Sequence, residues 1–202
     1  MLLAGDIGGT KTLLGLFILF VAMTWVAYPL HALWKGSQSL FAFWFVDAAI
    51  LQTIMFLVVF CLRPQIWRLS QTQPKLEDLA WLAVGFVFNS LPITTDLGPA
   101  YIFADVPKWL YGVVLCLYIP ILEEYISKTV FLRSLRLRVP TAVALFCVTL
   151  MTAIEHSSFL QAVPLQLLLC IVYVVRKNSL SASIACHIGA NIAAFLFFSK
   201  FV

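Results

Sequence analysis

The chain has 202 residues, of which 62% are hydrophobic and 11% are charged, and its mean hydropathy is +1.00. Soluble domains are closer to half apolar and a quarter charged, so this composition excludes an ordinary soluble enzyme. The formal net charge of +4 does not indicate nucleic-acid binding, because the basic residues lie between apolar runs rather than in a separate basic domain. The composition predicts an all-α, polytopic helical bundle in the lipid bilayer.

The first dozen residues, 1–12, form an N-terminal tail with a pattern of its own. Residues 6–12 (DIGGTKT) resemble the first phosphate-binding loop of the sugar-kinase fold, as found in bacterial glucokinases. A kinase of that fold needs a second phosphate loop and a sugar-binding segment, and neither follows in the chain. We therefore expect a tail that does not act as a phosphate site, followed by a multi-pass membrane domain over residues 13–202.

Seven apolar runs make up the predicted membrane domain. They cover about residues 13–33, 40–62, 79–93, 108–136, 140–157, 163–175 and 180–198. The fourth run exceeds the ~20 residues of a simple crossing, so we expect one long helix, bent near Pro120, whose last turns leave the membrane. With seven crossings most bases fall on one side, and the positive-inside rule makes that side, together with the N-terminus, cytoplasmic.

The fourth run carries two adjacent acids, Glu123 and Glu124, and a base one turn later, Lys128. Carboxylates are costly at membrane depth, so a pair of them indicates a functional site rather than packing. Glu124 and Lys128 are four residues apart and share a helix face, which favours an ion pair that keeps Glu124 charged.

Two later runs offer polar side chains at a similar depth. His156 lies near the end of the fifth run, and His187 and Asn191 are four residues apart on one face of the seventh. At ~1.5 Å per helical residue, these side chains and Glu123 lie roughly 13–25 Å from the basic side. We therefore expect three helices to present them to one buried cavity.

Such a set of side chains can activate water. A partly desolvated carboxylate can act as a general base near neutral pH, and an imidazole can share the same water. A second imidazole and a carboxamide can donate to a developing oxyanion. Zinc held by two His and two Glu is a competing arrangement, although the helical His-Glu-x-x-His pattern is absent. A transporter with a carboxylate proton relay is a weaker alternative, because no repeat halves are evident.

The residues now described resemble the motifs of the CPBP family, the type II CAAX prenyl endopeptidases and their bacterial relatives, which are glutamic intramembrane proteases. Residues 123–128 (EEYISK) are similar to the family's Glu-Glu-x-x-x-Arg, with Lys128 in place of Arg. Residues 152–156 (TAIEH) keep the His of Phe-x-x-x-His, with Thr152 in place of Phe. Residues 187–191 (HIGAN) match His-x-x-x-Asn.

The resemblance implies a membrane-embedded peptidase whose catalytic core covers about residues 108–198. It implies that Glu123 is the general base on water and that Glu124 orients the site. It also implies that His156 shares the water, while His187 and Asn191 form the oxyanion hole. Lys128 would support the site, although an ammonium cannot reproduce the bidentate fork of arginine.

The resemblance implies no cofactor and a peptide or protein substrate in or at the membrane, without nucleic acid. It is typical of a multi-pass protein of the bacterial cell membrane. A non-catalytic relative that acts as a membrane scaffold or an immunity-type binding protein is the alternative from a different class.

Overall fold

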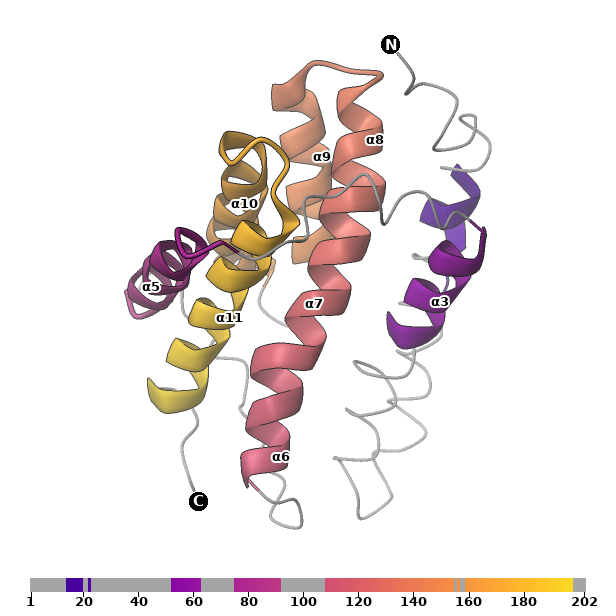
Figure 1. Cartoon of the computed structure of the whole chain (residues 1–202). Coiled ribbons are helices and arrows are strands. Elements are labelled where there is room, and N and C mark those ends of the chain that lie inside the picture. The colour runs from indigo at the N-terminus through magenta and orange to yellow at the C-terminus, as the bar shows by residue number, and fades with distance from the viewer. Residues whose placement is uncertain are drawn as a thin grey trace.

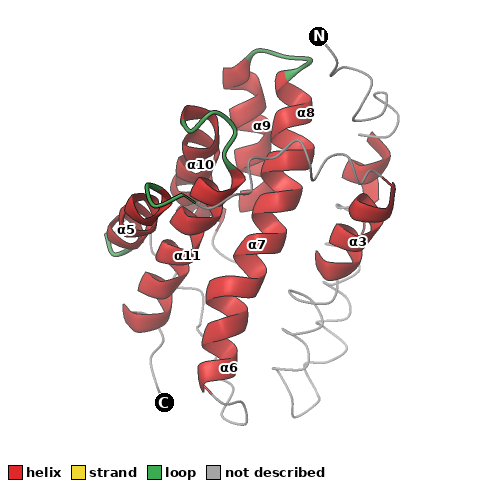
Figure 2. Ribbon diagram, in the orientation of Figure 1, coloured by secondary structure: helices red, strands yellow, loops and turns green. Residues whose placement is uncertain are grey.

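A computed structural model describes residues 14–19, 22, 52–62, 75–91, 108–154, 156 and 159–197. Within these ranges the elements are helices and none is a β-strand (Figure 2). The predicted all-α bundle is thus confirmed for this part of the chain. The kinase-like tail and most of the first two predicted runs lie outside it.

The described helices follow the predicted runs closely from residue 52 onward. Their bounds are α3 (Gln52–Leu62), α5 (Asp78–Asn89), α6 (Lys108–Val113), η2 (Val114–Tyr118), α7 (Ile119–Glu124), η3 (Tyr125–Leu132), α8 (Arg133–Arg136), α9 (Thr141–Ala153), α10 (Phe159–Val175) and α11 (Leu180–Phe197). One end differs from the prediction in a way that affects the site. Helix α9 ends at Ala153 rather than near residue 157, so His156 lies in the turn that follows the helix.

The fourth predicted run is one continuous helical rod, from α6 to α8, and is about 40 Å long at 1.5 Å per residue. Two of its segments, η2 and η3, have the wider π-helical turn. The first of them ends just before Pro120, which cannot donate a backbone hydrogen bond. Figure 1 shows this rod between α3 on one side and α9, α10 and α11 on the other.

Helices α5 and α11 cross with their backbones in contact. A Cβ atom at Gly85 would lie 1.8 Å from the carbonyl oxygen of Cys186, and one at Gly189 would lie 1.9 Å from that of Leu82. The buried amide of Asn89 also donates to the carbonyl of Ala190 at 2.9 Å. Small residues and interhelical hydrogen bonds drive helix association where lipid removes the hydrophobic drive. This crossing therefore fixes α11, which carries part of the site.

The turn between α10 and α11 is tied to the end of the long rod. Lys177 and Asn178 have positive φ angles of 55° and 65°, a conformation that asparagine tolerates better than most residues. The side chain of Arg136, at the end of α8, donates to the Oδ1 atom of Asn178. The start of α11 is thereby held against the last turn of the rod.

The surface of the bundle is apolar. Large apolar side chains are exposed on every long helix, for example Leu79 at 61%, Phe146 at 62% and Leu160 at 80%, and such a surface suits contact with lipid. Among the described helices, α11 is the one that is long and apolar enough to cross a membrane by itself. Helices α3, α5, α9 and α10 are apolar but shorter. The count of seven crossings stays a prediction.

Candidate active site

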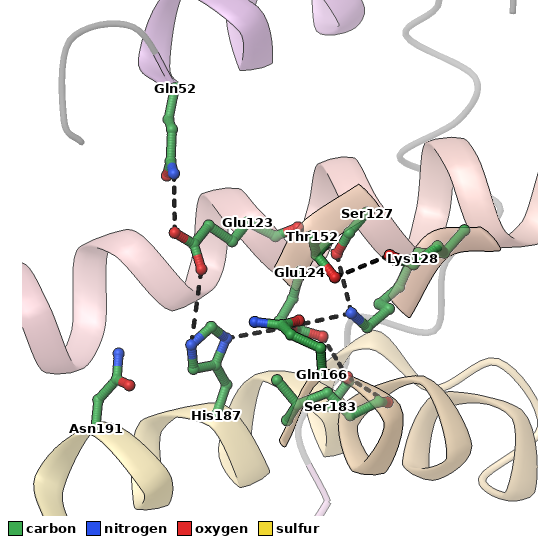
Figure 3. Close-up of polar contacts among 12 residues, drawn as sticks. Gln52, Glu123, Glu124, Ser127, Lys128, Thr152, Gln166, Ser183, His187 and Asn191 are labelled. Carbon is green, nitrogen blue, oxygen red and sulfur yellow. Dashed lines mark hydrogen bonds and ion pairs between the residues drawn. The ribbon is translucent and has the colours of Figure 1, made fainter. Parts of the chain in front are cut away.

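The imidazole of His187 lies between the two adjacent carboxylates (Figure 3). Its Nδ1 atom is 3.0 Å from Oε1 of Glu124, and its Nε2 atom is 3.7 Å from Oε2 of Glu123. The two acids come from the end of α7 and the imidazole from the middle of α11. Neighbouring positions on one helix thus reach opposite sides of a single ring on another.

Glu124 is the buried member of the pair, with its side chain 1% exposed. Besides His187, its carboxylate accepts a hydrogen bond from the hydroxyl of Ser183, one turn earlier on α11. The ammonium of Lys128 lies 3.6 Å away and is itself completely buried. A buried carboxylate persists only when other groups compensate its charge, and here three groups on two helices do so.

Lys128 occupies the position where the related motif has arginine. Its Nζ atom donates to the hydroxyl of Ser127 at 3.1 Å, and that hydroxyl donates to the backbone carbonyl of Glu123 at 2.6 Å. The predicted ion pair of Lys128 with Glu124 has an N–O distance longer than a hydrogen bond. The ammonium therefore supplies charge to Glu124 without the two parallel bonds of a guanidinium.

Glu123 is the more accessible acid, with its side chain 19% exposed. Its Oε1 atom accepts a hydrogen bond of 2.8 Å from the amide of Gln52, the first residue of α3. Its other oxygen faces His187. Sequence reasoning missed both Gln52 and Ser183. Ser183 could have been found, because it precedes His187 by four residues and so shares its face of α11.

His156 contacts a polar side chain of α10. Its Nε2 atom is 3.0 Å from the amide nitrogen of Gln166, which is buried on α10. An amide nitrogen can only donate, so Nε2 accepts this hydrogen bond. Thr152, which replaces the phenylalanine of the related motif, bonds back to the carbonyls of its own helix at Val148 and Thr149.

Asn191 donates to a backbone carbonyl of the long rod that lacks its helical donor. In η2, the N–H of Ile119 donates to the carbonyl of Val114, five residues earlier. The next such donor would be Pro120, which has no N–H, for the carbonyl of Leu115. That carbonyl accepts instead from Nδ2 of Asn191 at 2.8 Å. The structure therefore joins Asn191 to the site through the backbone just before the two acids.

A metal centre is not formed by these side chains. Within the part of the chain that is described, no group of three or more His, Cys, Asp and Glu side chains could hold a metal ion. The reason at this site is geometric. Glu123 and Glu124 face opposite nitrogens of His187, so the three groups do not point at one position.

Residues 105–193 match the family model described as type II CAAX prenyl endopeptidase Rce1-like. No curated protein and no solved structure matches the chain. The matched segment contains the long rod, α9, α10 and most of α11, and it leaves out α3 and α5. Members of this family are integral membrane proteases. The match confirms the resemblance that the motifs predicted, over the segment that carries all three of them.

Proposed function

We propose that the protein is an intramembrane endopeptidase that hydrolyses a peptide bond of a membrane-associated protein or peptide, with Glu123 activating the water. One observation carries the proposal. The partly exposed carboxylate of Glu123 faces an imidazole whose far side is held by the buried carboxylate of Glu124. An accessible base next to an oriented imidazole is the arrangement that acyl hydrolysis by water needs.

The distance between Oε2 of Glu123 and Nε2 of His187 allows one water molecule to contact both atoms. Two polar atoms that are 3.7 Å apart can both contact an oxygen that lies about 2.8 Å from each of them. In the proposed reaction Glu123 takes a proton from this water while the water oxygen bonds to the substrate's carbonyl carbon. The acid then gives that proton to the amide nitrogen as the carbon–nitrogen bond breaks, which leaves a carboxylic acid and an amine.

The proposal gives the other side chains separate roles. Glu124 accepts the Nδ1–H of His187 and so orients the ring, and when the ring carries a proton on both nitrogens its Nε2–H donates to the developing oxyanion. Asn191 donates its second amide N–H to the same oxyanion, because Nδ2 carries two hydrogens and the carbonyl of Leu115 accepts only one of them. His156 shares the water after exchanging its contact with Gln166 for it. The ammonium of Lys128 keeps Glu124 ionised.

A cleavage assay tests this function. The protein is reconstituted in liposomes with an internally quenched reporter peptide that ends in a farnesylated CAAX sequence, and with the same peptide without the lipid. We expect the wild type to cleave at least one of them and Glu123→Ala to cleave neither, at an unchanged thermal unfolding midpoint in detergent. Cleavage by Glu123→Ala would overturn the mechanism.

A second candidate is a non-catalytic scaffold or immunity-type binding protein, and the lysine at position 128 favours it. An ammonium 3.6 Å from Glu124 replaces the guanidinium of the related motif. The same assay separates the two functions. If the wild type is inactive on both peptides and Lys128→Arg cleaves either of them, the scaffold is favoured over the protease.

A further inference from the structure

Gln52 contacts the proposed base from outside the segment that matches the family model. It is the first residue of α3, and its Nε2 atom donates to Oε1 of Glu123 at 2.8 Å (Figure 3). The two residues are 71 positions apart in the chain. The contact therefore depends on how α3 packs against the long rod.

The packing of α3 directs the side chain of Gln52 toward Glu123. Gln52 is followed at helical spacing by Met55, Phe56 and Val59, and Met55 and Val59 are 2% and 0% exposed. The ring of Phe56 packs edge-on against that of Tyr125, with centroids 4.9 Å apart. Gln52 is thus the polar first member of the face that α3 turns toward the rod.

The carboxamide of Gln52 donates through its nitrogen to Glu123, and its oxygen is buried. Its Oε1 atom is shielded from solvent and accepts no hydrogen bond from any residue that the structure describes. A buried acceptor without a donor is unfavourable, so a group that arrives during function is a natural partner. The neighbouring base is proposed to attack a peptide bond, and a peptide backbone supplies N–H donors.

We propose that Gln52 is a positioning residue with a substrate contact. Its amide holds one oxygen of Glu123 so that the other faces His187, and its free carbonyl oxygen accepts a backbone N–H of the bound peptide. The inference rests on the proposed protease function. It extends the site beyond the family segment to α3.

Kinetics of Gln52→Leu test the positioning of Glu123. Leucine keeps the bulk of the side chain and removes both polar atoms. We expect kcat on the farnesylated reporter peptide to fall about 10- to 100-fold, as for loss of a hydrogen bond to a charged group.

The matched control is Thr53→Val, which removes the neighbouring polar contact of α3, a 2.5 Å bond with the hydroxyl of Tyr118. If α3 acts only as a structural support, both variants should lower kcat alike. A lower kcat in Gln52→Leu alone supports the positioning role, and equal losses of kcat in the two variants overturn it.

Reporter peptides that are N-methylated at one residue each, around the scissile bond, test the substrate contact. With the unmodified peptide, Gln52→Leu should raise KM about 2- to 10-fold. With one of the methylated peptides that difference should vanish, because the N–H that Gln52 accepts is gone. An undiminished KM ratio for every methylated peptide would overturn the contact.

Infrared spectroscopy separates this inference from the proposed function. The carboxyl band that disappears in Glu123→Gln belongs to Glu123, and it can be followed in an inactive protein. We expect Gln52→Leu to shift this band and Thr53→Val to leave it unchanged. If the wild type has no protease activity and Gln52→Leu still shifts the band, the positioning of Glu123 is supported and the proposed function fails. If the wild type is active and Gln52→Leu does not shift the band, the positioning is overturned and the proposed function stands.

Discussion

The Nδ1 atom of His187 lies 3.0 Å from Oε1 of Glu124, on the side of the ring that faces away from Glu123. This contact places two acids that are adjacent in the sequence in different environments. Glu124 is 1% exposed and is held by Ser183 and Lys128 as well, whereas Glu123 keeps 19% exposure. The first is enclosed by the fold, and the second is the partly exposed acid that we propose acts on the substrate.

Removing the charge of Lys128 should destabilise the protein. Lys128→Met leaves the buried carboxylate of Glu124 without its cation, and breaking a buried pair in this way costs about 3–5 kcal/mol. Thermal unfolding in detergent measures the effect. Lys75→Met, at an exposed position, is the control and should leave the midpoint unchanged. Equal midpoints for the two variants would show that Lys128 does not stabilise Glu124.

Alanine at Gly85 or Gly189 should force α5 and α11 apart. The added Cβ atom would lie under 2 Å from a backbone carbonyl oxygen of the facing helix in either case, and overpacking of this kind costs about 1–3 kcal/mol. Gly15→Ala is the matched control, because its Cβ atom would meet nothing within 4 Å. Thermal midpoints measured together would contradict the close crossing if all three variants behave like the wild type.

Asn191→Ala should destabilise the long rod by about 1–3 kcal/mol, because it leaves the part-buried carbonyl of Leu115 without a donor. Pro120→Ala restores a backbone N–H to that turn. In the double variant the cost of Asn191→Ala should therefore shrink, and a double-mutant cycle of unfolding free energies measures the difference. Strict additivity of the two substitutions would contradict the role of Asn191 as a backbone donor.

Chelators should not inhibit cleavage. Glu123 and Glu124 face opposite nitrogens of His187, so they cannot share one ion with it. The reporter assay is run with and without 1,10-phenanthroline, followed by added zinc. Loss of activity with the chelator and recovery with zinc would instead favour the metalloprotease.

The sequence was informative where helical spacing alone decides a contact. Glu124 and Lys128, which are four residues apart, lie together as predicted. The two acids also face His187 of a later helix. Prediction failed where a contact depends on packing or on the end of a helix. Nothing in the apolar run around Gln52 shows that its amide reaches Glu123. Hydropathy also did not show that α9 ends before His156.

Asn191 shows a second limit of sequence reasoning. Its spacing from His187 predicted a shared face, but its partner depends on a π-helical turn before Pro120. A proline that lacks an N–H can be read from the sequence. Which carbonyl it leaves without a donor depends on whether the turn is α- or π-helical, and hydrophobic periodicity does not resolve that.

The central claim is that Glu123 does the chemistry and Glu124 holds the site together. It is tested most directly by comparing Glu123→Gln with Glu124→Gln in the reporter assay and in thermal unfolding. We expect Glu123→Gln to lower kcat about a hundred- to ten-thousandfold at a nearly unchanged midpoint. We expect Glu124→Gln to lower the midpoint markedly. A Glu123→Gln variant that cleaves the reporter peptide at the wild-type rate would contradict the account.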